Sequence, residues 1–135
     1  MIKVIIIEPK EKPVVKEIEG GLDCLQKIVG GYIQVVYPFS DPVGIICNEE
    51  GKLNGLPLNR ALYHQGEIYD ILSGTIIVTG LTEDDFGSLT DELIEKYMER
   101  FYCGEEFMKV NGKIVAIPVL EHAEELAKRL WEGEE

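Results

Sequence analysis

The feature that most restricts the fold of this chain is a series of short, β-branched, apolar runs separated by glycine and proline. The runs cover residues 2–7, 32–37, 43–48 and 75–79. Runs this short and this rich in valine and isoleucine are typical of buried strands and not of core helices. The last run stands between Gly74 and Gly80, and we expect it to be a central strand of one sheet.

Helical periodicity appears between and after these runs. The apolar residues Leu22, Leu25, Ile28 and Val29 recur at helical spacing before Gly30-Gly31, which predicts a short helix of about nine residues. Thr90 is placed as an N-cap, and an apolar stripe follows it at Leu93, Ile94, Tyr97, Met98 and Phe101. Residues 121–131 predict a closing helix with Glu124–Lys128 and Glu125–Arg129 pairs and with Leu126, Ala127, Leu130 and Trp131 facing inward.

Turn signals predict how the strands pair. The polar break from Pro9 to Pro13 joins the first run to a second strand, and Asn111-Gly112 between two apolar segments suits a type I′ hairpin turn. The sequence of residues 59–64 predicts a short helical turn. The sequence of residues 67–72 fits an extended and a partly helical segment equally well. Together these elements predict a single α+β domain over residues 1–135. We expect a mainly antiparallel sheet, a short N-terminal helix and two helices in the C-terminal half.

Charge restricts the partners of the chain. The net charge is −12, and residues 1–81 carry a net −3 whereas residues 82–135 carry −9. This field repels phosphate backbones, so we expect no direct nucleic-acid binding. The acidic C-terminal half is either a solubilising surface or a face that mimics DNA or binds a basic host protein.

No residue pattern in the sequence predicts catalysis, a metal or a cofactor. The cysteines Cys24, Cys47 and Cys103 lack C-x-x-C spacing, and we expect them to be reduced. Neither His64 nor His122 lies beside an obvious nucleophile, and no triad or kinase signature is present. The apolar runs are too short for a membrane span or a secretory signal, so we expect a cytoplasmic protein.

The polar segment 47–60 is the candidate site. It contains three of the four asparagines in the chain, at positions 48, 54 and 59, and ends at Arg60. Its glycines and proline indicate a shaped loop, and loops held on a rigid scaffold often carry function. A guanidinium binds phosphate or carboxylate in two-point contacts, and carboxamides read base edges. We expect Asn48, Glu49, Asn54, Asn59, Arg60, Tyr63 and Tyr69 to form a ligand-binding pocket.

A structural interpretation of the same segment competes with the ligand site. The asparagines could cap turns and bind their own backbone, and Arg60 could pair with Glu49 or Asp70. Gly51, Lys52 and Gly55 match neither standard phosphate-loop spacing, so they do not strengthen the ligand hypothesis.

Four stretches carry a resemblance to a known family. They are 29–33 (VGGYI), 48–59 (NEEGKLNGLPLN), 66–75 (GEIYDILSGT) and 107–118, a Lys-Val-Asn-Gly hairpin that ends in Ala-Ile-Pro. Over nearly the whole chain the sequence resembles domain-of-unknown-function family 3846, found in phages, plasmids and bacterial mobile elements. The resemblance implies no activity, but it implies a small accessory protein that acts on host physiology or host defence.

Two functional hypotheses follow. The first is a non-enzymatic protein that binds, and thereby sequesters, a small anionic nucleotide-like ligand through the 47–60 segment. The second is a protein-interaction module in which the acidic residues 82–106 and the C-terminal helix bind a basic host factor or mimic DNA. A homo-oligomer, paired through an exposed sheet edge, is a further expectation.

Overall fold

The computed structural model describes residues 1–133. The strands are β1 (Ile2–Ile7), β2 (Val14–Ile18), β3 (Ile33–Val36), β4 (Val43–Asn48), β5 (Leu58–His64), β6 (Glu67–Ser73), β7 (Ile76–Leu81), β8 (Phe86–Gly87), β9 (Glu105–Val110) and β10 (Lys113–Pro118). The helices are α1 (Leu22–Val29), α2 (Asp91–Arg100) and α3 (Leu120–Gly133). Over this range, no helix is both long enough and apolar enough to cross a membrane.

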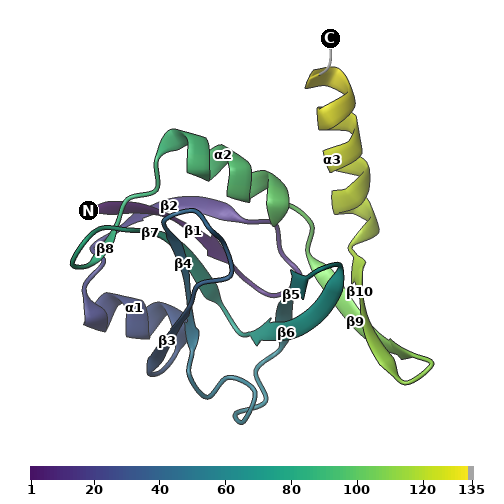
Figure 1. Ribbon diagram of the computed structural model, residues 1–135, viewed down its shortest axis with the longest axis horizontal. Helices are drawn as coiled ribbons and strands as arrows, with labels where there is room; N and C mark the ends of the chain where they lie inside the picture. The colour runs from purple at the N-terminus through teal and green to yellow at the C-terminus, as the bar shows by residue number, and fades with distance from the viewer. Residues whose placement is uncertain (134–135) are drawn as a thin grey trace.

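One antiparallel sheet forms the centre of the molecule (Figure 1). Its strand order is β2-β1-β7-β4-β3, and the short β8 pairs with the end of β7. The strand predicted at 75–79 is therefore central, since β7 pairs with β1 on one side and with β4 on the other. The predicted α+β class with a mainly antiparallel sheet is confirmed.

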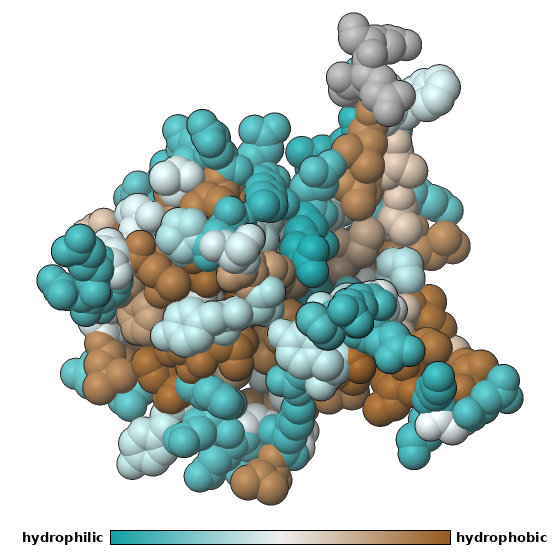
Figure 2. Space-filling model, in the orientation of Figure 1, coloured by the Kyte–Doolittle hydropathy of each residue, from teal (hydrophilic) through white to brown (hydrophobic). Residues whose placement is uncertain are grey.

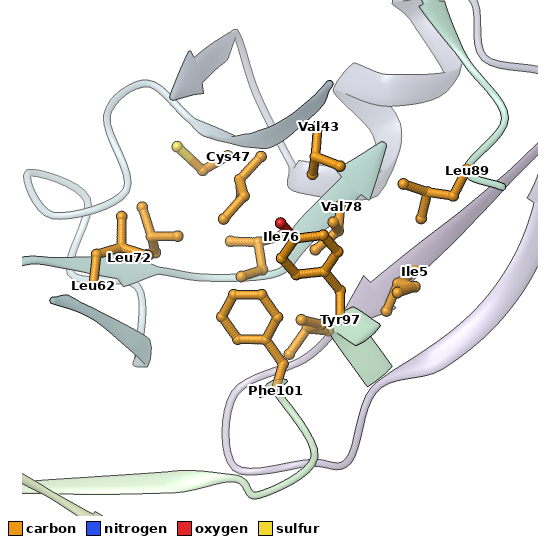
Figure 3. Close-up of a cluster of buried hydrophobic side chains, with 12 residues drawn as sticks. Ile5, Val43, Cys47, Leu62, Leu72, Ile76, Val78, Leu89, Tyr97 and Phe101 are labelled. Atoms are coloured by element: carbon orange, nitrogen blue, oxygen red, sulfur yellow. The ribbon is translucent and has the colours of Figure 1, made fainter. Parts of the chain in front are cut away.

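Both faces of this sheet are covered, which explains why its central strands are apolar on both sides. Alternate residues point to opposite faces, so Val4, Ile46 and Ile77 pack under α1. Their neighbours Ile5, Ile45 and Val78 pack on the other side with Tyr97 and Phe101 from the end of α2 (Figure 3). Every residue of β4 is buried, as expected for a strand between two layers.

The helix boundaries follow the sequence signals. Helix α1 ends at Gly30, which adopts a left-handed conformation with φ of 81°. The side chain of Thr90 caps α2 by accepting from the Leu93 N–H, and Asp91 and Glu92 occupy the first turn. Both features confirm predictions made from the sequence.

The prediction of a helical turn at 59–64 is wrong, because this segment is strand β5. It pairs with β6 in a separate two-stranded sheet. Of the two alternatives for residues 67–72, extended or partly helical, the structure therefore shows the extended one. The turn between them is Gln65-Gly66, where both residues have positive φ, 50° and 81°. Cross-strand pairing and burial against the main sheet outweigh the local helical preference of Arg60 to Leu62.

The C-terminal segment forms a hairpin and a projecting helix. Strands β9 and β10 pair around Asn111-Gly112, whose φ angles of 52° and 81° confirm the predicted turn. Helix α3 then extends away from the body of the molecule (Figure 1). The expectation that its apolar stripe faces inward is wrong in part, since Leu126 is half-buried but Trp131 is 72% exposed.

A matched pair of leucines in α1 tests this arrangement. Leu25 is 1% exposed and packs on the sheet, whereas Leu22 is 57% exposed in the same helix. We expect Leu25→Ala to lower the free energy of unfolding by about 2–5 kcal/mol. Leu22→Ala should change it by less than about 0.5 kcal/mol. Urea denaturation measures both, and equal losses would contradict the packing described for α1.

Candidate functional site

The predicted site begins where β4 ends, at Asn48. This side chain is 7% exposed and uses both ends of its amide. Its Nδ2 donates to the Val29 carbonyl at 3.1 Å, and its Oδ1 accepts from the Glu50 N–H at 2.8 Å. Asn48 therefore joins the end of α1 to the 47–60 segment and fixes the first turn of that segment. This is the structural role that competed with ligand binding for this residue.

Asn59 lies in the interior on β5 and is fully buried. Its Nδ2 donates to the Ile7 carbonyl at 2.9 Å and to the Gly74 carbonyl at 2.7 Å. Its Oδ1 accepts from Arg60 Nη1 at 2.9 Å. All three contacts lie within the protein, so this amide joins the end of β1 to the start of the β7 segment.

Arg60 is also fully buried, and oxygen atoms of the protein surround its guanidinium. Its Nη1 donates to Asn59 Oδ1, and its Nη2 donates to the Phe101 carbonyl at 3.0 Å and to the Glu11 carbonyl. Burial lowers the pKa of Arg60 from its ordinary value, and the nearby Glu105 partly opposes that shift. Arg60 Nε is buried without a hydrogen-bond partner among the described residues.

The acid whose charge acts most strongly on Arg60 is Glu105, at the start of β9. Its Oε1 accepts from the Ala61 N–H at 2.9 Å. Burial raises the pKa of Glu105 above its ordinary value of 4.5, although the Ala61 hydrogen bond and Arg60 act in the opposite direction. Glu105 thus attaches the C-terminal hairpin to β5.

The expectation that Arg60 and three asparagines converge on one open pocket is wrong. Asn59 and Arg60 are in the interior, Asn48 is largely enclosed, and Asn54 is exposed. The alternative pairing of Arg60 with Glu49 or Asp70 is absent from the ion pairs of residues 1–133, where Asp70 pairs with Lys52 instead. A buried strand position, not an open loop, determines what Arg60 contacts.

A hollow of about 730 Å³ lies beside this segment, between the β5–β6 hairpin and the β9–β10 hairpin. Four apolar side chains, Leu58, Ile68, Ile71 and Ile114, form part of its wall, and Tyr69 adds an aromatic ring that is 56% exposed. The charged lining residues are Lys52, Glu67, Asp70 and Lys113. The hollow therefore combines an apolar wall with two ammonium groups and two carboxylates.

A smaller hollow of about 110 Å³ adjoins the first and shares Lys52, Asp70 and Ile71 with it. Asn48 and Glu49 line the smaller hollow, and Tyr69 lines the larger one. The Lys52–Asp70 ion pair belongs to both linings, and the Asp70 carboxylate also accepts from the Ile71 N–H at 2.8 Å. Of the seven predicted residues, Asn54, Asn59, Arg60 and Tyr63 line neither hollow.

Sequence reasoning missed Lys52, Asp70 and Lys113 as members of one site. Lys52 is in the predicted loop, but its partner Asp70 is in β6 and Lys113 begins β10. No local spacing connects these three positions. Only the packing of the C-terminal hairpin beside β5 and β6 brings Lys113 to the same hollow as Lys52.

The thiols and imidazoles contribute little reactive chemistry to this region. Burial raises the pKa of Cys47 and of Cys103, which favours the unreactive thiol form at neutral pH. His122 Nδ1 accepts from the Gly104 N–H at 3.0 Å, which is a structural contact at the base of α3. Among residues 1–133, no group of three or more His, Cys, Asp or Glu side chains is placed to hold a metal ion.

Comparison with known proteins gives a family and no activity. The family model "Domain of unknown function (DUF3846)" matches residues 2–102. No curated protein and no solved structure matches the chain. The match ends just before β9, so the hairpin that supplies Lys113 and Ile114 to the larger hollow lies beyond it.

The Glu105 carboxylate predicts a pH dependence of stability. Its pKa is raised in the folded protein, so between pH 4.5 and that raised value the folded state binds more protons than the unfolded chain. The contribution of this group to stability therefore falls as pH rises through that window. Glu105→Gln keeps an acceptor for the Ala61 N–H and removes the titration.

We expect the free energy of unfolding of the wild type, minus that of Glu105→Gln, to increase as the pH is lowered from neutrality to about 4.5. Urea denaturation of both proteins across this range measures the difference. A difference that is constant with pH would show that burial does not shift this carboxyl group.

Proposed function

Because the chain belongs to the DUF3846 family, whose description assigns no activity, we propose its function from the larger hollow. The proposed function is non-catalytic binding of a small anionic, nucleotide-like ligand. The observation that carries the proposal is an aromatic ring and two lysines around one partly apolar hollow. We therefore place the proposed binding site at Lys52, Tyr69 and Lys113, and not at the buried Arg60.

The size of the hollow supports a small molecule. Ligand sites in proteins are usually clefts of about 300–1,000 Å³ with mainly apolar walls and a few polar groups. The volume of about 730 Å³ falls within this range, and the lining has that composition. A mononucleotide or a compact cyclic dinucleotide is a ligand of suitable scale.

The chemistry of the lining suggests how such a ligand would lie. Tyr69 offers an exposed ring on which a base could stack, and Ile68 and Ile114 extend the apolar wall. Lys52 and Lys113 are the cations that could meet a phosphate. Asp70 holds Lys52 in the lining through its ion pair, which reduces the freedom that this side chain loses on binding.

The charge of the hollow favours a compact ligand over a polymer. Its two lysines are balanced by Glu67 and Asp70, and the chain as a whole carries −12. A long phosphate backbone would meet this acidic field over its whole length, whereas a small anion in the hollow would meet only the four charges of its lining, two of which are ammonium groups. We therefore propose a small molecule and no direct binding of nucleic acid.

A binding protein of this kind could act by sequestration. We propose that it removes a signalling nucleotide of the host, in keeping with the resemblance to an accessory-protein family of phages and other mobile elements. Sequestration requires a preformed pocket and sufficient protein, but no catalytic group. The free thiols, of which Cys47 is buried and Cys24 and Cys103 are half-buried, and the absence of a catalytic motif in the sequence are compatible with this role.

Isothermal titration against linear and cyclic nucleotides tests the proposal. We expect one of them to bind and to raise the melting temperature. Tyr69→Ala should weaken that binding by about 1–3 kcal/mol through lost stacking. Lys113→Ala should weaken it by about tenfold, which corresponds to 1.4 kcal/mol.

Lys27→Ala is the matched control, because it removes the same charge from α1 on an exposed position outside the hollow. It should leave the affinity unchanged. No heat and no thermal shift with any nucleotide would refute the proposal, and so would equal losses from Lys113→Ala and Lys27→Ala.

A further inference from the structure

Helix α3 carries an apolar stripe that the rest of the chain covers only in part. At about 100° per residue, its apolar side chains fall on one side of the helix. They are Leu120, Ala123, Leu126, Ala127, Leu130 and Trp131. Ala123 and Leu126 are half-buried, whereas Leu120, Leu130 and Trp131 are 71%, 47% and 72% exposed. Figure 2 shows apolar side chains along α3, at the upper right of the molecule.

The contacts that hold α3 against the body are mainly polar. Glu125 accepts from Lys12 Nζ and from the Tyr102 hydroxyl, both at 2.8 Å, and the Arg129 guanidinium lies over the Tyr102 ring. These contacts are on one side of the helix, at its middle. An isolated helix of this length is marginal in water, and most helices gain stability by burying an apolar face. The uncovered half of the stripe is therefore available for a partner.

A groove of about 540 Å³ runs between α2 and α3 beside this stripe. Its apolar lining residues are Met98 from α2 and Leu126 and Leu130 from α3, with Tyr102 between the two helices. It shares no lining residue with the proposed ligand hollow. The groove is therefore a separate feature, and its function can be tested independently of ligand binding.

The charges around the groove indicate what would occupy it. Glu95 and Glu99 stand on the α2 wall, one helical turn apart, and both are exposed. Glu124 is exposed on the opposite flank of the α3 stripe. None of the three forms an ion pair within residues 1–133. Arg129 of α3 also lines the groove, but its guanidinium lies over the Tyr102 ring. The unpaired carboxylates on the two flanks of the apolar strip therefore match an apolar stripe flanked by lysines or arginines.

We propose that the α2–α3 groove is the docking site for a basic amphipathic helix of a partner protein. The apolar face of that helix would lie on Met98, Leu126 and Leu130 and extend to Trp131. Its flanking cations would pair with Glu95, Glu99 and Glu124. This is a helix-in-groove interface, in which apolar anchors supply affinity and the charges select the partner.

The same charges disfavour a second copy of the chain as the occupant. In a pairing of two α3 helices, the α3 of one copy would enter the groove of the other. It would bring Glu124, which flanks the α3 stripe, toward Glu95 and Glu99. Like charges placed opposite one another destabilise an interface, and each copy carries −12 overall.

Trp131 provides a direct readout, because it is the only tryptophan in the chain and is largely exposed. The probe is a synthetic helical peptide of about 18 residues, or five turns, with a leucine stripe flanked by lysines. The matched probe has glutamate in place of every lysine. We expect the lysine peptide to shift the Trp131 emission to shorter wavelength in a saturable way, and the glutamate peptide to leave it unchanged.

Charge-reversal variants separate docking in the groove from general attraction to an acidic protein. The double variant Glu95→Lys/Glu99→Lys should weaken binding of the lysine peptide at least tenfold. The control Glu83→Lys/Asp84→Lys changes the net charge equally, at exposed positions in the loop before β8, and should leave the affinity within about twofold. Leu130→Asp, which alters only the apolar strip, should also weaken binding.

Three results would overturn the proposal. The first is equal binding of the lysine and glutamate peptides. The second is an equal loss of affinity from the two double variants, which would indicate unspecific charge attraction. The third is a Trp131 emission that is already blue-shifted without peptide and returns to longer wavelength on dilution, together with a dimeric mass. That result would assign the groove to a second copy of the chain.

Discussion

The burial of the Arg60 guanidinium is the constraint on which the rest of this structure depends. A buried charge is tolerated only where oxygen atoms take the place of water around it. Here the oxygens come from the carbonyl of Glu11 in the β1–β2 loop, the side chain of Asn59 in β5 and the carbonyl of Phe101 after α2. One side chain therefore joins three segments that are far apart in the sequence, and Asn59 extends the network to Ile7 and Gly74.

This network also positions the two surfaces for which we propose functions. It fixes β5 against the main sheet, and Glu105 accepts from the Ala61 N–H and so sets the start of the C-terminal hairpin beside β5. The hollow between the two hairpins and the groove between α2 and α3 both follow from this placement. The family match ends at residue 102, so the hairpin that completes the hollow and the helix that forms one wall of the groove are both contributed by the segment beyond it.

Much of the fold was predictable from local patterns, whereas the site was not. Strand β7, the Thr90 cap and the Asn111-Gly112 turn each follow from a few neighbouring residues. Local preference predicts a helical turn at 59–64, but pairing with β6 makes this segment a strand. A solitary arginine beside a polar loop suggests an anion site, and this pattern predicts a ligand-binding role for Arg60. Its three oxygen partners include backbone carbonyls from positions 11 and 101, which no sequence pattern indicates. The exposure of the outer half of the α3 stripe could not be predicted either, because periodicity locates an apolar face but does not show what covers it.

The most direct test of the central claim is the stability of Arg60→Met, measured by equilibrium denaturation beside Lys52→Met. Both changes replace a long cation with an apolar chain of similar length, but Arg60 is fully buried and the Lys52 side chain is 61% exposed. Arg60→Met leaves buried carbonyl and amide oxygens without a donor, at about 1–3 kcal/mol for each such group. We predict that it lowers the free energy of unfolding by at least about 2 kcal/mol. Lys52→Met should lower it by no more than about 1 kcal/mol. Equal, small losses from the two variants would contradict the claim that the Arg60 network holds the three segments together.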